Sequence, residues 1–252
     1  MALTVVARGR EVSVAVFTHR AGEPRSVREW WPRPCLAFTQ YGAWSVRARH
    51  GGGDVDPGVL LVGTGGAEYD CDHPYGADDR NVAVVFPDGT ELPRGTLVPV
   101  TGRIAALRRE LRRAVRAAAG GPDLDALAWS LVAAAGSPAA ATPSPYARES
   151  ARRVRALLDR HYRDSELDLA TVAAETGLSR TRMIHVFREV TGVTPHRYLL
   201  ERRVTDAAGR LASTGAPVGE ICFASGFGSM ARFHEAFRRA FGMCPSDYRA
   251  RA

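Results

Sequence analysis

The first hundred residues alternate apolar and polar positions in short runs. Such runs lie at 11–18, 44–49, 58–63 and 81–86, and they are separated by turn-forming clusters such as HGGGDVDPG and FPDGTELPRG. In a β-strand, successive side chains point to opposite faces, so a pattern that repeats every two residues indicates a strand with one apolar face. Many short strands separated by turns are typical of a β-sandwich or barrel. We therefore expect residues 1–100 to be β-rich.

From Thr101 the apolar period becomes that of a helix, which ends before Gly120-Gly121, and a second helix is predicted over 123–135. The apolar face of the first helix consists of Ile104, Leu107, Leu111 and Val115. Two amphipathic helices after a β domain either cover that domain or pair with a second subunit. The pattern alone favours neither alternative.

Residues 136–148 are predicted to be a linker, because GSPAAATPSP has three prolines, small residues and no charge. Helical periodicity resumes at 149–162 and continues to the end of the chain. Thr194-Pro195, an N-cap residue followed by proline, predicts the start of a long helix that extends to about Ser213. The predicted fold class is α+β with two domains. These are residues 1–135, with strands in 1–100 and helices in 101–135, and residues 149–252, which are all α.

The C-terminal domain contains one unit twice. An offset of 50 residues relates Phe187 to Phe237, Met183 to Phe233, Gly192 to Gly242, Pro195 to Pro245 and Tyr198 to Tyr248. An offset of 49 relates Ala173 to Cys222 and Gly177 to Gly226. Each copy is predicted to be a helix-turn-helix, in which the glycine gives the turn its backbone freedom and the small residue lets the two helices cross closely.

The second helix of each copy has a polar face opposite its apolar face. At about 100° per residue, Thr181, His185 and Arg188 point outward in the first copy, with Arg182 beside them. Ala231, Glu235 and Arg238 do so in the second copy, flanked by Arg232 and Arg239. Such side chains suit base edges and phosphates in a major groove. The candidate DNA-binding residues are Ser179, Arg180, Thr181, Arg182, His185, Arg188, Ser229, Arg232, Glu235, Arg238 and Arg239.

The charge distribution favours a polyanionic partner for this half. The chain has a net charge of +7 and no lysine, and residues 146–252 hold 18 arginines against 12 acidic residues, so +6 lies there. Double-stranded DNA is the expected partner, although solvated helix faces are often arginine-rich too and helix-turn-helix units also mediate protein contacts. The sequence has no apolar run of eighteen residues and no signal peptide, so we expect a cytoplasmic protein without a membrane partner.

Two stretches carry a family resemblance, LDLATVAAETGLSRTRMIHVFREVTGVTPHRYLLERR and VGEICFASGFGSMARFHEAFRRAFGMCPSDYR. Residues 150–252 resemble the DNA-binding domain of the AraC/XylS family of transcription regulators. The resemblance implies two recognition helices joined by a rigid long helix. It implies base-facing positions for Thr181, Arg182 and His185 in the first helix and for Ala231, Arg232 and Glu235 in the second. Ala231 replaces the usual serine, and Arg202 and Arg210 replace apolar residues of the joining helix, so the packing of that helix is expected to differ.

The resemblance also implies a cupin-like N-terminal domain for sensing and dimerisation, a small-molecule effector, a homodimer and RNA polymerase as a partner. The alternative is a DNA-binding regulator without an effector, whose N-terminal domain serves only dimerisation or protein contacts. Residues 55–86 lack the HxH cluster of enzymatic cupins, so we expect no metal, no cofactor and no enzymatic activity. Cys71-Asp72-His73, with His50, lacks a second spaced ligand pair, and His73 is predicted to be a turn residue.

The segment at 28–44, REWWPRPCLAFTQYGAW, concentrates aromatic residues, namely Trp30, Trp31, Phe38, Tyr41 and Trp44. Aromatic side chains at this density either line an effector pocket or form core and subunit interface. The second interpretation is slightly favoured.

Overall fold

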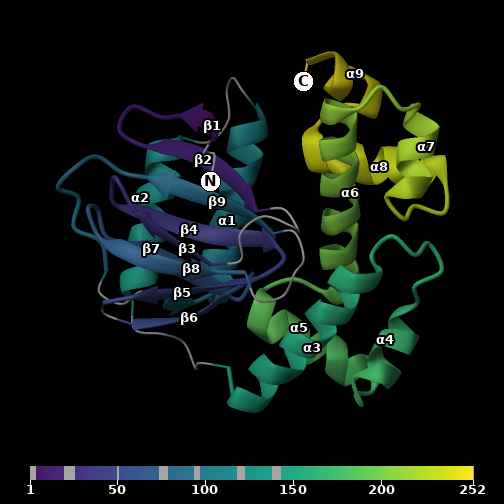
Figure 1. The fold of residues 1–252 in the computed structure, drawn as a ribbon, viewed down its shortest axis with the longest axis horizontal. Helices are drawn as coiled ribbons and strands as arrows, with labels where there is room; N and C mark the ends of the chain where they lie inside the picture. Colours follow the sequence, from purple (N-terminus) through teal and green to yellow (C-terminus); the bar gives the residue numbers. More distant parts are fainter. Residues whose placement is uncertain are drawn as a thin grey trace. The chain divides into compact units, whose positions relative to one another are not determined.

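The computed structural model describes residues 4–19, 26–49, 51–73, 79–93, 97–117, 123–137 and 143–251. The chain forms two compact units, one of Met1–Ser144 with Val190–Gly192 and one of Pro145–Glu189 with Val193–Ala252. The first unit is β-rich with two helices, and the described part of the second is helical (Figure 1). Within the described ranges, no helix has the length and apolar character needed to cross a membrane.

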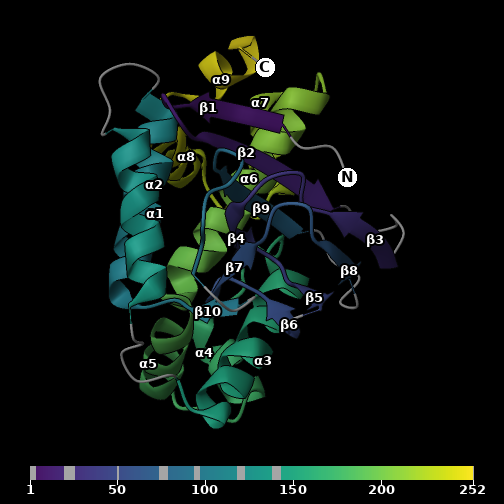
Figure 2. The same cartoon turned by 90° about the vertical axis from the view of Figure 1, so that its left-hand side faces the viewer.

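The strands of the first unit form two antiparallel sheets (Figure 2). The larger sheet has the order β1-β2-β9-β4-β7-β10, and the smaller has the order β3-β8-β5-β6. The strands are β1 (Thr4–Arg8), β2 (Ser13–His19), β3 (Ser26–Trp30), β4 (Cys35–Tyr41), β5 (Trp44–Ala48), β6 (Gly51–Val55), β7 (Val59–Gly63), β8 (Glu68–Asp72), β9 (Asp79–Val85) and β10 (Leu97–Pro99).

The larger sheet is covered on both faces, so its strands are apolar at successive positions. Leu36 and Phe38 of β4 join a core with helices α1 (Gly102–Ala117) and α2 (Leu124–Gly136). Cys35 and Ala37 of the same strand join a second core with residues of the smaller sheet. The alternation along a strand therefore assigns even residues to the helices and odd residues to the space between the sheets.

The apolar stripe of α1 lies inside its own unit. Ile104 and Leu111 are fully buried in the core that α1 and α2 form with the larger sheet. The two helices therefore cover the β domain, and the alternative in which this stripe pairs with a second subunit does not agree with its burial.

The aromatic segment contributes mainly to core. Trp31, Phe38, Tyr41 and Trp44 are buried, which agrees with the favoured interpretation, whereas Trp30 is 64% exposed. Trp31 stacks on Tyr69 of the smaller sheet, with ring centroids 4.9 Å apart. Large rings thus fill the space between the two sheets.

The four predicted strand runs correspond to β2, β5, β7 and β9. In contrast, β6 falls in HGGGDVDPG, which was predicted to be a turn. It pairs with β5, with Val46 opposite Gly53. A Cβ atom at Gly52 would meet the backbone of Val46 and Arg47, so the glycine permits a close strand approach. His73, the predicted turn residue, follows β8 but is buried, while His50 lies outside the described residues.

The helices of the second unit are α3 (Pro145–His161), α4 (Leu169–Glu175), α5 (Arg180–Thr191), α6 (Pro195–Ser213), α7 (Val218–Ala224), α8 (Met230–Phe241) and α9 (Pro245–Arg251). Helix α3 starts inside the predicted linker, because proline is well suited to a first helical position, and α2 extends to Gly136. The predicted start of α6 is confirmed. The hydroxyl of Thr194 accepts a hydrogen bond from the backbone N–H of Arg197 at 3.3 Å, and Pro195 is the first helical residue.

Candidate nucleic-acid interface

Two helix pairs, α4–α5 and α7–α8, lie at opposite ends of α6 (Figure 1). The chain leaves the first helix of each pair through a glycine in the left-handed region, Gly177 with φ 68° and Gly226 with φ 86°. The small residues Ala173 and Cys222, at the predicted crossing points, are buried. The local backbone therefore repeats as the sequence offset predicts.

The packing behind the second helix also repeats. The Phe187 ring of α5 lies edge-on to Tyr198, with centroids 5.6 Å apart and planes at 73°. The Phe237 ring of α8 lies edge-on to Tyr248, at 5.5 Å and 79°. Both phenylalanines are fully buried. Each pair thus anchors its second helix through the same aromatic contact, which fixes the face that the helix turns outward.

The outward face of α5 carries the residues predicted for it. Thr181, Arg182, His185 and Arg188 are all exposed, as are Ser179 and Arg180. The guanidinium carbon of Arg182 lies 5.9 Å from the ring centroid of Tyr146, a cation–π contact at the surface. Tyr146 is itself 54% exposed, so this contact holds Arg182 at the surface without burying it.

The outward face of α8 is similar. Ala231, Arg232, Glu235, Arg238 and Arg239 are exposed. A guanidinium nitrogen of Arg239 lies 3.6 Å from a carboxylate oxygen of Glu235, and both side chains are more than 70% exposed. An exposed pair of this kind contributes only about 0–1 kcal/mol. A ligand can therefore replace it at little cost.

Both second helices begin with a serine cap. The Ser179 hydroxyl accepts from the backbone N–H of Arg182 at 3.2 Å, and the half-buried Ser229 hydroxyl accepts from that of Arg232 at 3.4 Å. The remaining N–H groups of a helix start, together with the helix dipole, attract anions. The two serines thus have a structural role in starting the helices, beside their predicted DNA contact.

Comparisons with known proteins agree on this half of the chain. A family model described as "Helix-turn-helix domain" matches residues 172–251. The regulatory protein SoxS of Salmonella typhimurium is 37% identical over 94 residues, which are 37% of this chain and 87% of SoxS. The chain belongs to the AraC/XylS family of transcription regulators.

Other members of the AraC/XylS family match the same half. The arabinose operon regulatory protein of Escherichia coli is 31% identical over 90 residues, 36% of this chain and 31% of that protein. The chain is also similar to a crystal structure of the DNA-binding domain of AdpA in complex with a target DNA. The identity is 31%, with 40% of this chain and 91% of that chain covered and a TM-score of 0.39.

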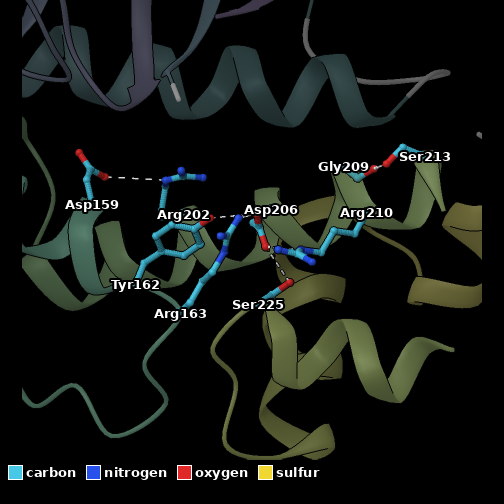
Figure 3. Close-up of polar contacts among 9 residues, drawn as sticks. All are labelled: Asp159, Tyr162, Arg163, Arg202, Asp206, Gly209, Arg210, Ser213 and Ser225. Carbon is cyan, nitrogen blue, oxygen red and sulfur yellow. Dashed lines mark hydrogen bonds and ion pairs between the residues drawn. The ribbon is translucent and has the colours of Figure 1, made fainter. Parts of the chain in front are cut away.

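In this AraC/XylS domain the joining helix α6 carries a buried carboxylate that links several helices, shown in Figure 3. One oxygen of Asp206 accepts from the Tyr162 hydroxyl at 3.0 Å and from Arg163 at 3.1 Å. The other accepts from Arg210 Nε at 2.7 Å and from the Ser225 hydroxyl at 3.0 Å. Asp206 therefore joins the end of α3, helix α6 and the end of α7.

Burial by itself would raise the pKa of Asp206, whose side chain is 9% exposed. The hydrogen bonds from Arg210 and Arg163, and the positive charges of both, outweigh burial and lower this pKa. The carboxylate is therefore the stable form in the folded protein. Sequence analysis did not identify this role, since three of the four donors, Tyr162, Arg163 and Ser225, are distant from Asp206 along the chain.

Arg202 and Arg210, the departures from the family pattern in α6, have different surroundings. Arg202 is only 3% exposed, with its guanidinium carbon 4.1 Å from the centroid of the Tyr162 ring. Its Nε lies 3.8 Å from a carboxylate oxygen of Asp159, which also accepts from the Tyr198 hydroxyl at 2.9 Å. The packing of α6 thus accommodates Arg202 inside the domain, while Arg210 is half-buried beside Asp206.

The Asp159→Asn variant should lack a pH dependence of stability that the Asp159 carboxyl group gives the wild-type protein. Burial raises the pKa of Asp159 to about 6, against the opposing effects of Arg202, Arg155 and the Tyr198 hydroxyl. Because this pKa lies above the ordinary value of 3.8, the folded state binds the proton more tightly than the unfolded chain. The resulting stabilisation is complete below about pH 4 and is lost as the pH rises through about 6.

Urea unfolding of the full chain, followed by circular dichroism from pH 4 to pH 7, measures this effect. The wild-type protein should lose on the order of 3 kcal/mol of unfolding free energy across that interval relative to the variant. Asp247→Asn, at an exposed acid of α9, is the matched control. A difference between Asp159→Asn and wild type that is the same at pH 4 and pH 7 would contradict this assignment.

Proposed function

We propose that this chain regulates transcription by binding a specific DNA sequence through both helix pairs, each acting as a helix-turn-helix that places its second helix in a major groove. The carrying observation is the repeated anchoring of α5 and α8, which turns two exposed polar faces outward from one helical unit. The major groove is wide enough for one α-helix. The charge of +6 in this half supports a polyanionic partner.

Two recognition helices on one chain contact a longer, asymmetric DNA site than one helix does. Each mismatched base pair costs about 1–3 kcal/mol, so a single helix contacting a few base pairs discriminates weakly among genomic sites. We assign base contacts to Thr181, Arg182 and His185 on α5 and to Arg232 and Glu235 on α8. Phosphate contacts go to the remaining set, Ser179, Arg180, Arg188, Ser229, Arg238 and Arg239.

The proposal predicts different effects for base-reading and phosphate-binding residues. Arg182→Ala and Glu235→Ala should each change the preferred base at one position of a site selected from random duplexes by the full chain. Arg239→Ala should instead weaken binding to all sequences alike, and should reduce the slope of affinity against salt by about one unit. Binding of the wild-type chain should fall steeply with salt, because counterions are released from DNA.

Arg28→Ala provides the control. This arginine is 72% exposed on β3 of the first unit, so its removal subtracts the same charge without touching α5 or α8. It should leave site preference unchanged. Enrichment of no sequence by the wild-type chain, or the same loss of affinity for Arg28→Ala as for Arg239→Ala, would argue against specific binding through these helices.

For the β-rich unit we propose a cupin-like regulatory role in a cytoplasmic homodimer, with a small molecule or partner modulating contacts to DNA and RNA polymerase. The two-sheet architecture and the family support this role. The alternative is a domain that serves only dimerisation or protein contacts. It has support from the stacking of Trp31 on Tyr69, because these rings form core between the sheets, where they do not line an effector pocket. Stabilisation of the chain by a metabolite would favour the first, because a ligand that binds only the folded state raises its stability.

A further inference from the structure

A polar cluster interrupts the apolar core between the two sheets of the first unit. His19, His73 and Asp79 are 7%, 5% and 0% exposed. His19 ends β2 and faces Asp79, the first residue of β9, in the strand register. Both have odd numbers, like the neighbouring core residues Phe17 and Ala83, so the alternation directs them toward the smaller sheet. His73 approaches from the end of β8 in that sheet.

The three side chains converge on one carboxylate oxygen. Nδ1 of His73 lies 2.7 Å from Oδ2 of Asp79, and Nδ1 of His19 lies 3.9 Å from the same oxygen. The two imidazole rings stack with centroids 3.5 Å apart and planes at 7°. One ligand atom from each residue lies within 4.8 Å of the other two.

We propose that His19, His73 and Asp79 bind a divalent transition-metal ion of the Zn²⁺ class. Two imidazole nitrogens and one carboxylate oxygen form a donor set that suits Zn²⁺ and related ions, and three protein ligands leave a position open for water or another ligand. Tetrahedral bonds of about 2.0–2.2 Å hold ligand atoms about 3.4 Å apart. The observed separations of 2.7 and 3.9 Å bracket that value. Because an imidazole binds a metal in the plane of its ring, one of the two stacked rings must turn out of the stack to complete the site.

A second layer of polar groups already orients the ligands. Nδ2 of Asn81 donates to Oδ1 of Asp79 at 2.6 Å, which leaves Oδ2 toward the histidines. Oδ1 of Asn81 in turn accepts from the Thr39 hydroxyl at 2.7 Å and from the indole N–H of Trp44 at 2.9 Å. Such outer hydrogen bonds fix the geometry of ligating carboxylates and histidines in metal sites.

The other ring nitrogen of His73 is also supported. Its Nε2 lies 3.2 Å from Sγ of Cys71. If Nδ1 binds the metal, Nε2 carries the proton and can donate it to this sulfur. The ring therefore has one nitrogen directed to the proposed ion and one directed to a neighbour that can hold the required tautomer.

A hydrogen-bond network with only a structural role would need one imidazole beside Asp79, whereas two are present. One imidazole satisfies a buried carboxylate, and His73 with Asn81 already does so. A second imidazole stacked on the first, with its Nδ1 toward the same oxygen, places two nitrogens on one side of Asp79. A divalent cation bound there would compensate the charge of the carboxylate inside the core. This proposal differs from the expectation, drawn from the sequence, that the unit holds no metal.

Titration of the metal-stripped full chain with Co²⁺ tests the proposal. The wild-type chain should bind one Co²⁺ ion with visible d–d absorption, and Zn²⁺ should displace it. Asp79→Asn keeps an acceptor for Asn81 but removes the anionic ligand, and His73→Gln and His19→Gln each remove a nitrogen ligand. Each variant should bind Co²⁺ at least about 10-fold more weakly. His161→Gln, at an exposed histidine of α3, should bind like wild type.

X-ray absorption of the wild-type Zn²⁺ complex provides a measurement that needs no variant, should the buried substitutions disturb folding. It should show two imidazole ligands with oxygen ligands. Failure to bind Co²⁺, binding that the three variants leave intact, or a shell without imidazole would each overturn the proposal. None of these results bears on DNA binding, because every proposed ligand belongs to the first unit.

Discussion

Asp206→Ala should lower the unfolding free energy of the helical unit by on the order of 3 kcal/mol. The substitution leaves the Ser225 hydroxyl and the Tyr162 hydroxyl without their carboxylate acceptor, and Ser225 is fully buried. Arg163 and Arg210 are 54% and 34% exposed, so water can solvate them. The loss of unfolding free energy is therefore smaller than for a fully buried ion pair, yet it is large for a single substitution in a small domain.

Affinity for the selected DNA site should fall as well. Ser225 directly precedes Gly226, so its bond to Asp206 fixes the end of α7 relative to α6 and thereby the start of the turn into α8. Urea unfolding and DNA titration of the same preparations, at a temperature where both proteins are folded, measure the two effects. Asp206→Asn, which keeps one acceptor oxygen, should show a smaller loss of stability.

Glu175→Ala is the control for charge, since this exposed acid lies at the end of α4. Its effect should remain within about 0.5 kcal/mol. If Asp206→Ala is as stable as Glu175→Ala, the network in Figure 3 contributes nothing to stability and the proposed coupling of α3, α6 and α7 is wrong.

Gly226→Ala should be far more damaging than Gly177→Ala, although the two glycines occupy equivalent positions of the repeat. Both have positive φ, 86° and 68°, and this conformation costs an alanine about 1–2 kcal/mol. A Cβ atom at Gly226 would in addition collide with the carbonyl oxygen of Tyr162 and approach the backbone of Arg163, whereas nothing lies within 4 Å of one at Gly177. Backbone atoms cannot rotate away as a side chain can.

We therefore expect Gly177→Ala to lose about 1–2 kcal/mol and Gly226→Ala to lose several kcal/mol or to accumulate as insoluble protein. Urea unfolding of soluble variants and the soluble fraction on expression provide the measurements. Each glycine serves as the control for the other. Equal losses at both positions would mean that the backbone contact at Gly226 is absent in solution.

The contrast between these glycines shows where sequence reasoning about the site succeeds and where it ends. The repeat offset identified both turns, and the phase of the apolar residues placed Thr181 and Glu235 on exposed faces, because these depend on local periodicity. The clash at Gly226 depends on where the end of α3 passes. Periodicity carries no information about contacts between segments that are distant along the chain.

The β-rich unit shows the same division. Four strands were predicted from alternation, but β6 was taken for a turn, because its glycines form a strand only through pairing with β5. His73 was interpreted from its neighbours in sequence as a turn residue. Its ring is buried beside His19, which lies more than fifty positions away, and no local pattern indicates that contact.

The order of a β-rich and a helical unit, the doubled helix pair, the polar faces of α5 and α8, and the family could all be inferred from the sequence. Each of these follows from the spacing of residue types, since burial of one face imposes a period on the chain. Three features became apparent from the folded arrangement alone: the α1 stripe covers its own sheet, Asp206 connects three helices, and His19, His73 and Asp79 meet. Those contacts arise because packing brings distant segments together, and a buried polar group must then find its partner among them.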